Sequence, residues 1–138
     1  NVLLMISGGI AACKSLELIR LLTRDGDAVR TILTASAQQF VTPLSVAALS
    51  GQEVYTDLFS LKDETEMGHI RLSRQADCIV VCPASANFLA RMAAGMAGDL
   101  ATATLLAADK PIHLCPAMNP RMWAHPATQD NIQTLERR

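Results

Sequence analysis

The sequence predicts an α/β fold, a doubly wound three-layer sandwich in which helices cover both faces of a mostly parallel sheet. Short apolar runs alternate with helix-type patterns along the whole chain. The run at 78–82 is apolar throughout, as expected for a strand buried on both faces. Polar residues follow several apolar runs, which is where open α/β sheets carry their ligand-binding groups.

The first half of the chain is predicted to be a βαβ unit followed by a further helix. Residues 2–6 form an apolar run that ends in glycines, and 14–23 have the apolar spacing of an amphipathic helix. A second strand is predicted at 28–33, parallel to the first because a helix connects them. A helix is expected from Pro43 to Leu49. The irregular stretch 54–65 is expected to be a surface loop or a flap.

The second half continues the same alternation of helices and strands. The pattern predicts a helix at 67–75, a strand at 78–82, helices at 87–94 and 100–108, a strand at 112–115, and a last helix from Thr128. The chain has no internal repeat and no linker, so a single sheet should organise it.

Composition narrows the classes of function. With 138 residues, the chain is expected to be one domain around one core. Its net charge of -1 gives no reason to expect nucleic acid or an anionic membrane as a partner. No apolar run reaches the ~20 residues of a membrane span. No basic segment precedes the first apolar run, so the sequence predicts a cytoplasmic protein without a signal peptide.

Cysteine and histidine spacing argues against a metal site. No Cys-x-x-Cys pair is present, and the three histidines lack metal-ligand spacing. Small apolar core residues in a reducing compartment are the favoured interpretation of the four cysteines, ahead of a disulfide or zinc framework. These cysteines are Cys13, Cys78, Cys82 and Cys115.

Three polar loops that follow strands, at 7–12, 83–87 and 116–123, are predicted to meet at the carboxyl edge of the sheet. Ser-Gly-Gly at 7–9 follows the first strand, and its glycines would let the backbone approach a phosphate, although a tight β–α turn is an equally good interpretation. Thr34 and Ser36 follow the second strand and could donate to the same phosphate, but a plain helix cap is the commoner role of such a pair.

Two residues are candidates for chemistry. Imidazole ordinarily titrates near neutral pH, so His69 is the best general-base candidate, although a histidine near a helix start is more often a surface residue. The amide of Asn119 can bind a carboxylate without carrying charge, but an asparagine that begins a turn is the simpler interpretation. Met122 and Trp123 are either core anchors or the wall of a site for a flat ring.

Taken together, these motifs resemble the homo-oligomeric flavin-containing cysteine decarboxylases, over nearly the whole chain. The two most specific signatures are Pro-Ala-Ser-Ala-Asn at 83–87 and Pro-Ala-Met-Asn-Pro-Arg-Met-Trp at 116–123. Gly-His-Ile at 68–70 and Gly-Met-Ala-Gly-Asp-Leu at 95–100 also fit in order and spacing. Within the family, the chain is most similar to the bacterial decarboxylases of coenzyme A synthesis, which are often fused to a phosphopantothenate–cysteine ligase.

The resemblance implies an FMN site in a Rossmann-like flavoprotein fold. It assigns the cofactor to Ser7, Gly9, Thr34, Ser36, Pro83, Ala84, Ser85, Ala86, Asn87 and Leu114. It assigns catalysis to His69 and Asn119. It assigns substrate contacts to Ala117, Asn119 and Met122.

The implied reaction is FMN-dependent decarboxylation of 4'-phospho-N-pantothenoyl-L-cysteine to 4'-phosphopantetheine. FMN supplies the redox chemistry, and the protein positions and polarises the substrate. Oxidation of the cysteinyl CH₂–SH gives a thioaldehyde, an electron sink β to the carboxylate, and loss of carbon dioxide then gives an enethiol. His69 would assist deprotonation of the thiol, and Asn119 would orient the carboxylate.

One part of the family's pattern is missing from this chain. The family's proton-donating cysteine lies on a substrate flap C-terminal to the Pro-x-Met-Asn motif, and none of the four cysteines matches it. Residues 1–138 are therefore expected to be a single decarboxylase domain, either truncated before the flap or lacking the reductive half of the reaction. Such a chain should bind FMN and stop at the enethiol.

Rival functions and the assembly state stay open. A peptidyl-cysteine decarboxylase of lantibiotic maturation shares the fold, the flavin and the histidine. A non-catalytic flavin-binding regulatory subunit is the alternative from another class, and His69 and Asn119 argue against it. A prenyl-flavin synthase lacks the Pro-x-Met-Asn-x-x-Met-Trp motif. The resemblance also implies a homotrimer or a dodecamer, with FMN at a subunit interface.

Overall fold

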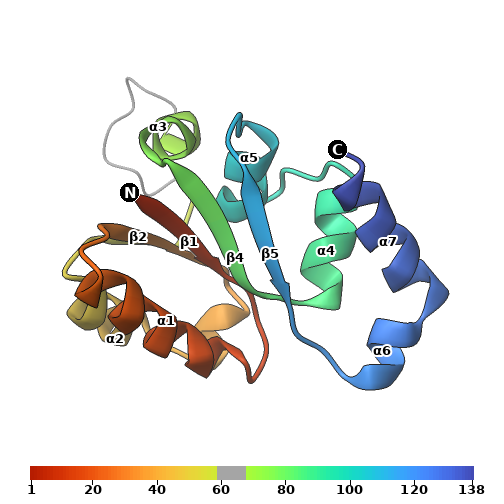
Figure 1. The fold of residues 1–138 in the computed structure, drawn as a ribbon, viewed down its shortest axis with the longest axis horizontal. Helices are drawn as coiled ribbons and strands as arrows, with labels where there is room; N and C mark the ends of the chain where they lie inside the picture. The colour runs from red at the N-terminus through yellow and green to blue at the C-terminus, as the bar shows by residue number, and fades with distance from the viewer. Residues whose placement is uncertain (59–67) are drawn as a thin grey trace.

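Five parallel strands form the sheet in this computed structural model, which describes residues 1–58 and 68–138 (Figure 1). The strand order is β3-β2-β1-β4-β5, and every described pair is parallel. The strands are β1 (Val2–Ile6), β2 (Val29–Leu33), β3 (Val54–Tyr55), β4 (Cys78–Ala84) and β5 (Ile112–Pro116). The predicted fold class is confirmed by the strand order. β2 and β3 lie on one side of β1, and β4 and β5 lie on its other side, as in doubly wound folds.

Helices cover both faces of this sheet. They are α1 (Ala12–Arg24), the 3-10 turn η1 (Ala37–Gln39), α2 (Pro43–Ser50), α3 (Gly68–Gln75), α4 (Ala86–Ala93), α5 (Leu100–Leu106), α6 (Pro120–Ala124) and α7 (Pro126–Glu136). Every helix predicted from the sequence is present within a few residues of its expected bounds, whereas η1 and α6 were not predicted. Met67 lies outside the described residues.

Two apolar clusters, one on each face, hold the layers together. The first face packs under α1, η1 and α2, with Leu4, Ile6 and Leu33 from the strands and Ile19 from α1; we call it the α1 face. The second face packs under α3, α4 and α5, with Met5 and Val81 from the strands and Phe88 from α4; we call it the α4 face. All five residues of β1 are buried, because strands flank it and helices cover both its faces.

Local sequence signals explain where several elements begin and end. The Thr42 hydroxyl accepts a hydrogen bond from the Ser45 N–H in a capping box, and Pro43 occupies the first helical turn of α2. Gly51 closes α2 with φ of 64°, a left-handed conformation that glycine adopts without strain. The predicted closure at glycine is therefore confirmed.

The structure corrects two expectations from the sequence. Val54–Tyr55 is not loop but the edge strand β3, which pairs in parallel with Thr31 and Ile32. Two residues are too short a run to show strand periodicity, so the pattern could not reveal it. The rest of the expected loop is described only as far as 58, and 59–67 lie outside the described residues. Cys13 and Cys115 are exposed rather than buried, whereas Cys78 and Cys82 are half-buried.

Candidate active site

Ser7 joins two of the predicted loops, 7–12 and 83–87. It follows β1, is 2% exposed, and its hydroxyl donates to the carbonyl oxygen of Pro83 at 2.6 Å. The same hydroxyl accepts from the backbone N–H of Ser85 at 3.0 Å, and the Ser7 N–H also donates to Pro83 at 3.3 Å. Because the only hydroxyl proton of Ser7 is engaged inside the protein, Ser7 fixes the two loops against each other.

The loop after β1 and the residues after β2 approach each other at Gly8. A Cβ atom at Gly8 would lie 2.6 Å from both the Cβ and the Oγ of Ser36, closer than such atoms approach in proteins. Gly9 has φ of 149°, and a Cβ atom there would meet no atom within 4 Å. Glycine is thus required at 8 by close packing, and at 9 by a backbone conformation that faces open space.

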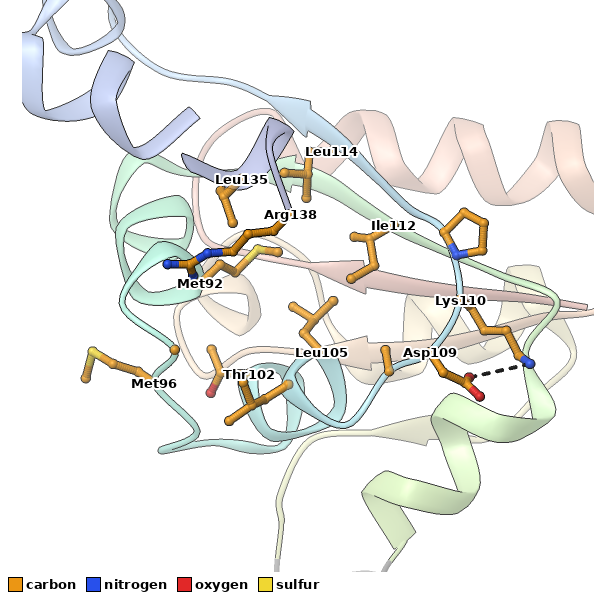
Figure 2. Close-up of a pocket in the computed structure, with 14 residues that line it drawn as sticks. Met92, Met96, Thr102, Leu105, Asp109, Lys110, Ile112, Leu114, Leu135 and Arg138 are labelled. Atoms are coloured by element: carbon orange, nitrogen blue, oxygen red, sulfur yellow. Dashed lines mark ion pairs between the residues drawn. The ribbon is translucent and has the colours of Figure 1, made fainter. Parts of the chain in front are cut away.

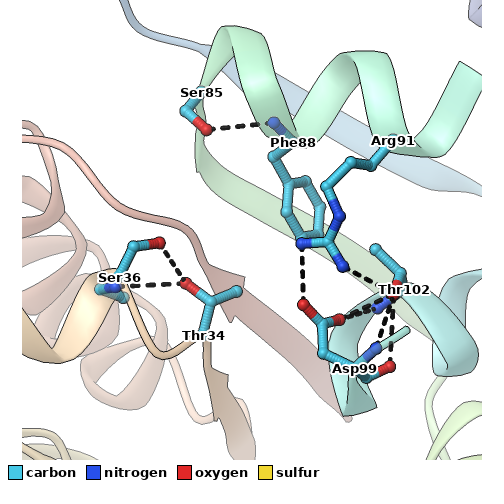
Figure 3. A network of polar contacts seen from close by, with 8 residues as sticks. Thr34, Ser36, Ser85, Phe88, Arg91, Asp99 and Thr102 are labelled. Carbon is cyan, nitrogen blue, oxygen red and sulfur yellow. Dashed lines mark hydrogen bonds and ion pairs between the residues drawn. The ribbon is translucent and has the colours of Figure 1, made fainter. Parts of the chain in front are cut away.

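Two hydroxyls stand at the carboxyl end of β2. The Oγ1 of Thr34 lies 3.2 Å from the Oγ of Ser36 and accepts from the Ala37 N–H at 3.2 Å (Figure 3). Thr34 is 7% exposed, and Ser36 is exposed. Thr34 thus holds the first residue of η1, but the N-cap of η1 is Ser36, which makes no side-chain cap hydrogen bond and is exposed beside Gly8.

The loop 83–87 begins within β4 and ends in the first turn of α4. The Ser85 hydroxyl accepts from the Phe88 N–H at 3.2 Å, which starts α4 and places the Phe88 ring in the core (Figure 3). Pro83 follows a cis peptide bond, and Pro83 and Ala84 are buried, Ser85 and Ala86 half-buried and Asn87 exposed. The Ala117 N–H donates to the Ala84 carbonyl at 3.1 Å, so the loop after β5 joins the same group.

Asn119 is the N-cap of α6 in this structure. Its Oδ1 accepts from the Arg121 N–H at 2.8 Å, so the turn interpretation is confirmed. The side-chain NH₂ group is a separate pair of donors, and the residue is exposed, so the carboxylate-binding role is compatible with the cap. A cavity of about 370 Å³ lies beside it, lined by Pro116, Ala117, Met118, Pro120 and Trp123.

Two predicted site residues lie apart from this group. Leu114 is half-buried within β5, where it packs against the core cluster of the α4 face. His69 is half-buried in the first turn of α3, beside the residues that the structure does not describe. Figure 1 shows α3 near the start of β4 and α6 beyond the end of β5, so these two helices lie apart in one chain. Met122 is 48% exposed on α6.

An ion pair that the sequence interpretation missed borders the site. Arg91 on α4 binds the Asp99 carboxylate at 2.8 Å, and Asp99 accepts from the Thr102 N–H at 2.8 Å as the N-cap of α5 (Figure 3). Asp99 and Thr34 line a common cavity of about 420 Å³. The sequence did contain a signal for this cap, because Thr102 follows Asp99 by three residues at the start of an apolar run.

Hydrogen bonding keeps Asp99 ionised. Burial favours the neutral acid, but hydrogen bonds from Thr102 and the Arg91 guanidinium outweigh burial and lower the pKa of Asp99 below its ordinary value. Asp99 therefore carries a negative charge at neutral pH, and this charge holds the start of α5 to α4.

A larger cavity lies elsewhere. It measures about 660 Å³ and lies between α4, α5, α7 and β5, with Leu105, Ile112 and Leu135 on its walls (Figure 2). Lys110 and Asp109 form an ion pair of 3.4 Å at its rim. This cavity is on the α4 face rather than at the loops after the strands, so it does not belong to the candidate site.

Within the described residues, no cluster of three or more histidine, cysteine, aspartate or glutamate side chains could hold a metal ion. Nor does any helix in this part of the chain have the length and apolarity needed to cross a bilayer.

Comparison with known proteins places this fold and its loops in a family. Residues 1–138 match the Flavoprotein family, and the chain belongs to that family. It is 50% identical over 138 residues to the coenzyme A biosynthesis bifunctional protein CoaBC of Mycobacterium bovis, covering 100% of this chain and 32% of that protein. The chain spans about a third of the length of the curated relatives it matches.

Solved structures are similar over almost the whole chain. The FMN-dependent cysteine decarboxylase SpaF superposes with a TM-score of 0.93 at 35% identity, over 99% of this chain and 79% of that one. A cysteine-to-serine mutant of PPC decarboxylase, complexed with pantothenoylaminoethenethiol, superposes with a TM-score of 0.86 at 35% identity. That match covers 99% of this chain and 76% of the other. The resemblance predicted from the motifs is therefore confirmed at the level of family and fold.

Proposed function

We propose that this domain binds FMN and decarboxylates 4'-phospho-N-pantothenoyl-L-cysteine in coenzyme A biosynthesis. The observation that carries the proposal is the contact between loops far apart in sequence, through Ser7, Gly8 and Ala117. The similarity to CoaBC proteins and to an FMN-dependent cysteine decarboxylase supports the same function.

The residues at the carboxyl edge fit the two ends of FMN. The exposed hydroxyl of Ser36 and the open space beside Gly9 suit a phosphate, which needs donors and a close backbone. The side chains from Pro83 to Ala86 are small, so a flat ring can pack against this segment of the backbone. Ser7, Thr34 and Ser85 would hold these loops in place through the hydrogen bonds they already make. Asn87 continues the same segment into the first turn of α4.

The side chains divide the work on the substrate. The NH₂ group of Asn119 would donate to the substrate carboxylate and orient it, with Ala117 and Met122 beside it. His69 would accept the thiol proton, because imidazole titrates near neutral pH. When bound, FMN supplies two-electron redox chemistry. Leu114 would contribute only from within β5, behind the loop that carries Ala117.

A site that uses both His69 and Asn119 requires more than one copy of the chain. One chain keeps α3 and α6 apart, so we propose a homo-oligomer, a trimer or a dodecamer, in which His69 of one copy faces Asn119 of another. A fused phosphopantothenate–cysteine ligase is part of the proposal, because the CoaBC relatives are bifunctional and about three times as long.

The proposal is tested by spectroscopy and product analysis. The purified protein should show flavin absorption bands and release carbon dioxide from phosphopantothenoylcysteine. The mass of the product tells whether the reaction stops at the enethiol or continues to 4'-phosphopantetheine. A peptide that ends in cysteine tests the lantibiotic-type alternative, and flavin binding without turnover of either compound would support the regulatory one.

His69→Asn separates catalysis from binding. Loss of the proton acceptor should lower turnover by about 10²-fold or more, while the flavin spectrum stays unchanged. His113→Asn is the matched control, because His113 is an exposed histidine within β5 and should turn over normally. Unchanged turnover in His69→Asn would exclude the proposed role of that residue.

A further inference from the structure

Two cysteines lie on neighbouring strands at a β-bulge. Val81 of β4 pairs with Leu114 of β5, and pairing resumes at Ala84 and Pro116. Cys82 and Pro83 therefore lie opposite the single residue Cys115. Neighbouring strands are ~4.8 Å apart, within the range of Cα separations of about 4.4–6.8 Å that a disulfide spans.

Both side chains belong to the same face of the sheet. Val80 and Cys82 pack against the core cluster of the α1 face. Val80 pairs with His113, and Cys115 lies two residues beyond His113, so strand alternation places Cys115 on that face as well. Cys115 is exposed and Cys82 half-buried, so solvent reaches the first thiol more readily than the second.

The two thiols differ in their readiness to react. Burial, followed by the neighbouring thiol of Cys115, raises the pKa of Cys82 to about 11. Cys82 is therefore protonated at neutral pH, and the exposed Cys115 is the group that a reagent in solution meets first.

We propose that Cys82 and Cys115 form a modification site, a dithiol that closes to an intramolecular disulfide by exchange with a low-molecular-weight disulfide such as oxidised glutathione. The Cys115 thiolate attacks oxidised glutathione, forms a mixed disulfide and releases one glutathione thiolate. Cys82 then loses its proton to solvent and attacks the Cys115 sulfur, releasing the second glutathione. Two protein thiols are oxidised, and one glutathione disulfide is reduced to two thiols.

This bond would join β4 and β5 immediately before the loops that carry Pro83 and Ala117. The Ala117 N–H already donates to Ala84, so the covalent link would reinforce a contact that the reduced protein makes. The inference does not depend on flavin binding, because strand pairing alone brings the two cysteines together.

Peptide mapping of a Cys78→Ser variant tests the site. Trypsin leaves Cys78 and Cys82 in one peptide, 75–91, so removing Cys78 makes the assignment unique. Cys115 is the only cysteine in peptide 92–121, since the Lys110–Pro111 bond resists trypsin. After equilibration with reduced and oxidised glutathione at mildly alkaline pH, acid quenching and alkylation, we expect these two peptides to be linked. Reduction should release them.

Three comparisons decide the outcome. The linked species should be lost when Cys82→Ser or Cys115→Ser is added to the Cys78→Ser background, with folding checked by circular dichroism. Cys13, exposed on α1, serves as the ordinary thiol and should take up glutathione equally in all variants. A stable glutathione adduct on Cys115 without any linked peptide would overturn the proposal. So would a link from Cys115 to Cys13.

Discussion

At the scale of single residues, the candidate site depends on a few atoms that join separate loops. Ser7 uses its one hydroxyl to bridge Pro83 and Ser85, and Gly8 lets the first loop touch Ser36. The glycine motif at 7–9 predicted a close approach of the backbone to a phosphate, which stays a prediction, and the structure shows a close approach of Gly8 to the side chain of Ser36. No local pattern in the sequence could reveal this contact.

Gly8→Ala should destabilise the protein and weaken FMN binding. The new methyl group would lie 2.6 Å from Ser36, whose short side chain cannot move away, so overpacking of about 1–3 kcal/mol is expected. Gly98→Ala is the matched control, because its methyl group would meet only the Arg91 guanidinium, at 3.9 Å. Urea unfolding measures the first effect and flavin titration the second. Equal stability of the two variants would contradict the packing argument.

Ser7→Ala and Ser36→Ala should differ in what they disturb. Removing the Ser7 hydroxyl leaves buried backbone groups of Pro83 and Ser85 with one partner fewer, which costs about 1–3 kcal/mol. Ser36→Ala, at an exposed position, should change the free energy of unfolding by less than about 0.5 kcal/mol yet weaken FMN binding. Thermal unfolding and flavin titration of both variants check this division. A stable Ser7→Ala protein with weakened FMN binding would instead make Ser7 a ligand.

At the scale of elements, apolar runs and caps were visible in the sequence, and short or irregular pieces were not. The buried strands β1 and β4 and the helix α2 were predicted because pattern and capping agreed. The strand β3 and the five-residue helix α6 were missed, since each is too short to show a period. The start of α5 was predicted, but not the ion pair from Arg91 that holds it.

Asp99→Asn should reduce stability only where Asp99 is ionised. The pKa of Asp99 is lowered in the folded protein, so the unfolded chain takes up its proton at higher pH than the folded chain does. The stabilisation is therefore present above about pH 4 and is lost as the pH falls below that value. The variant should be about 0.5–1 kcal/mol less stable at neutral pH, because Asn keeps the cap but not the ion pair.

Urea unfolding of both proteins from neutral to acidic pH measures this difference. The gap between wild type and Asp99→Asn should close with acidification, and a gap that persists unchanged would contradict the charge argument. Asp25→Asn is a suitable control, since Asp25 is exposed at the end of α1 and pairs only loosely with Arg24, at 3.7 Å. Its stability should follow the wild type at every pH.

At the scale of the whole molecule, the predicted sheet with helices on both faces is confirmed, and the two residues proposed for catalysis lie on different helices. His69 and Asn119 were grouped by resemblance, and the fold places them in the first turn of α3 and at the N-cap of α6, two helices that lie apart in Figure 1. Sequence pattern describes the elements of one chain and carries no information on which copies meet. The assembly of these two residues into one site therefore stays a prediction from the resemblance.

Subunit mixing tests whether the site is composite. Co-expression of His69→Asn with Asn119→Ala should restore decarboxylation, because some interfaces would then combine an intact histidine with an intact asparagine. With random assembly, roughly a quarter of the sites should be intact, and so roughly a quarter of the wild-type activity is expected. Mixing the separately purified proteins without subunit exchange is the control. No recovery in verified mixed oligomers would place both residues in the same subunit's site.

The position of β1 in the sheet also determines when its amide protons exchange with deuterium. It lies between β2 and β4, and none of its residues is more than 7% exposed, so its amide protons can meet deuterium only after both neighbours separate. Exchange there should report the global unfolding of the chain. Amide protons of the edge strand β3 should exchange far sooner. Ligands that bind at the carboxyl edge should slow amide exchange in β1 only by shifting the folding equilibrium toward the native state.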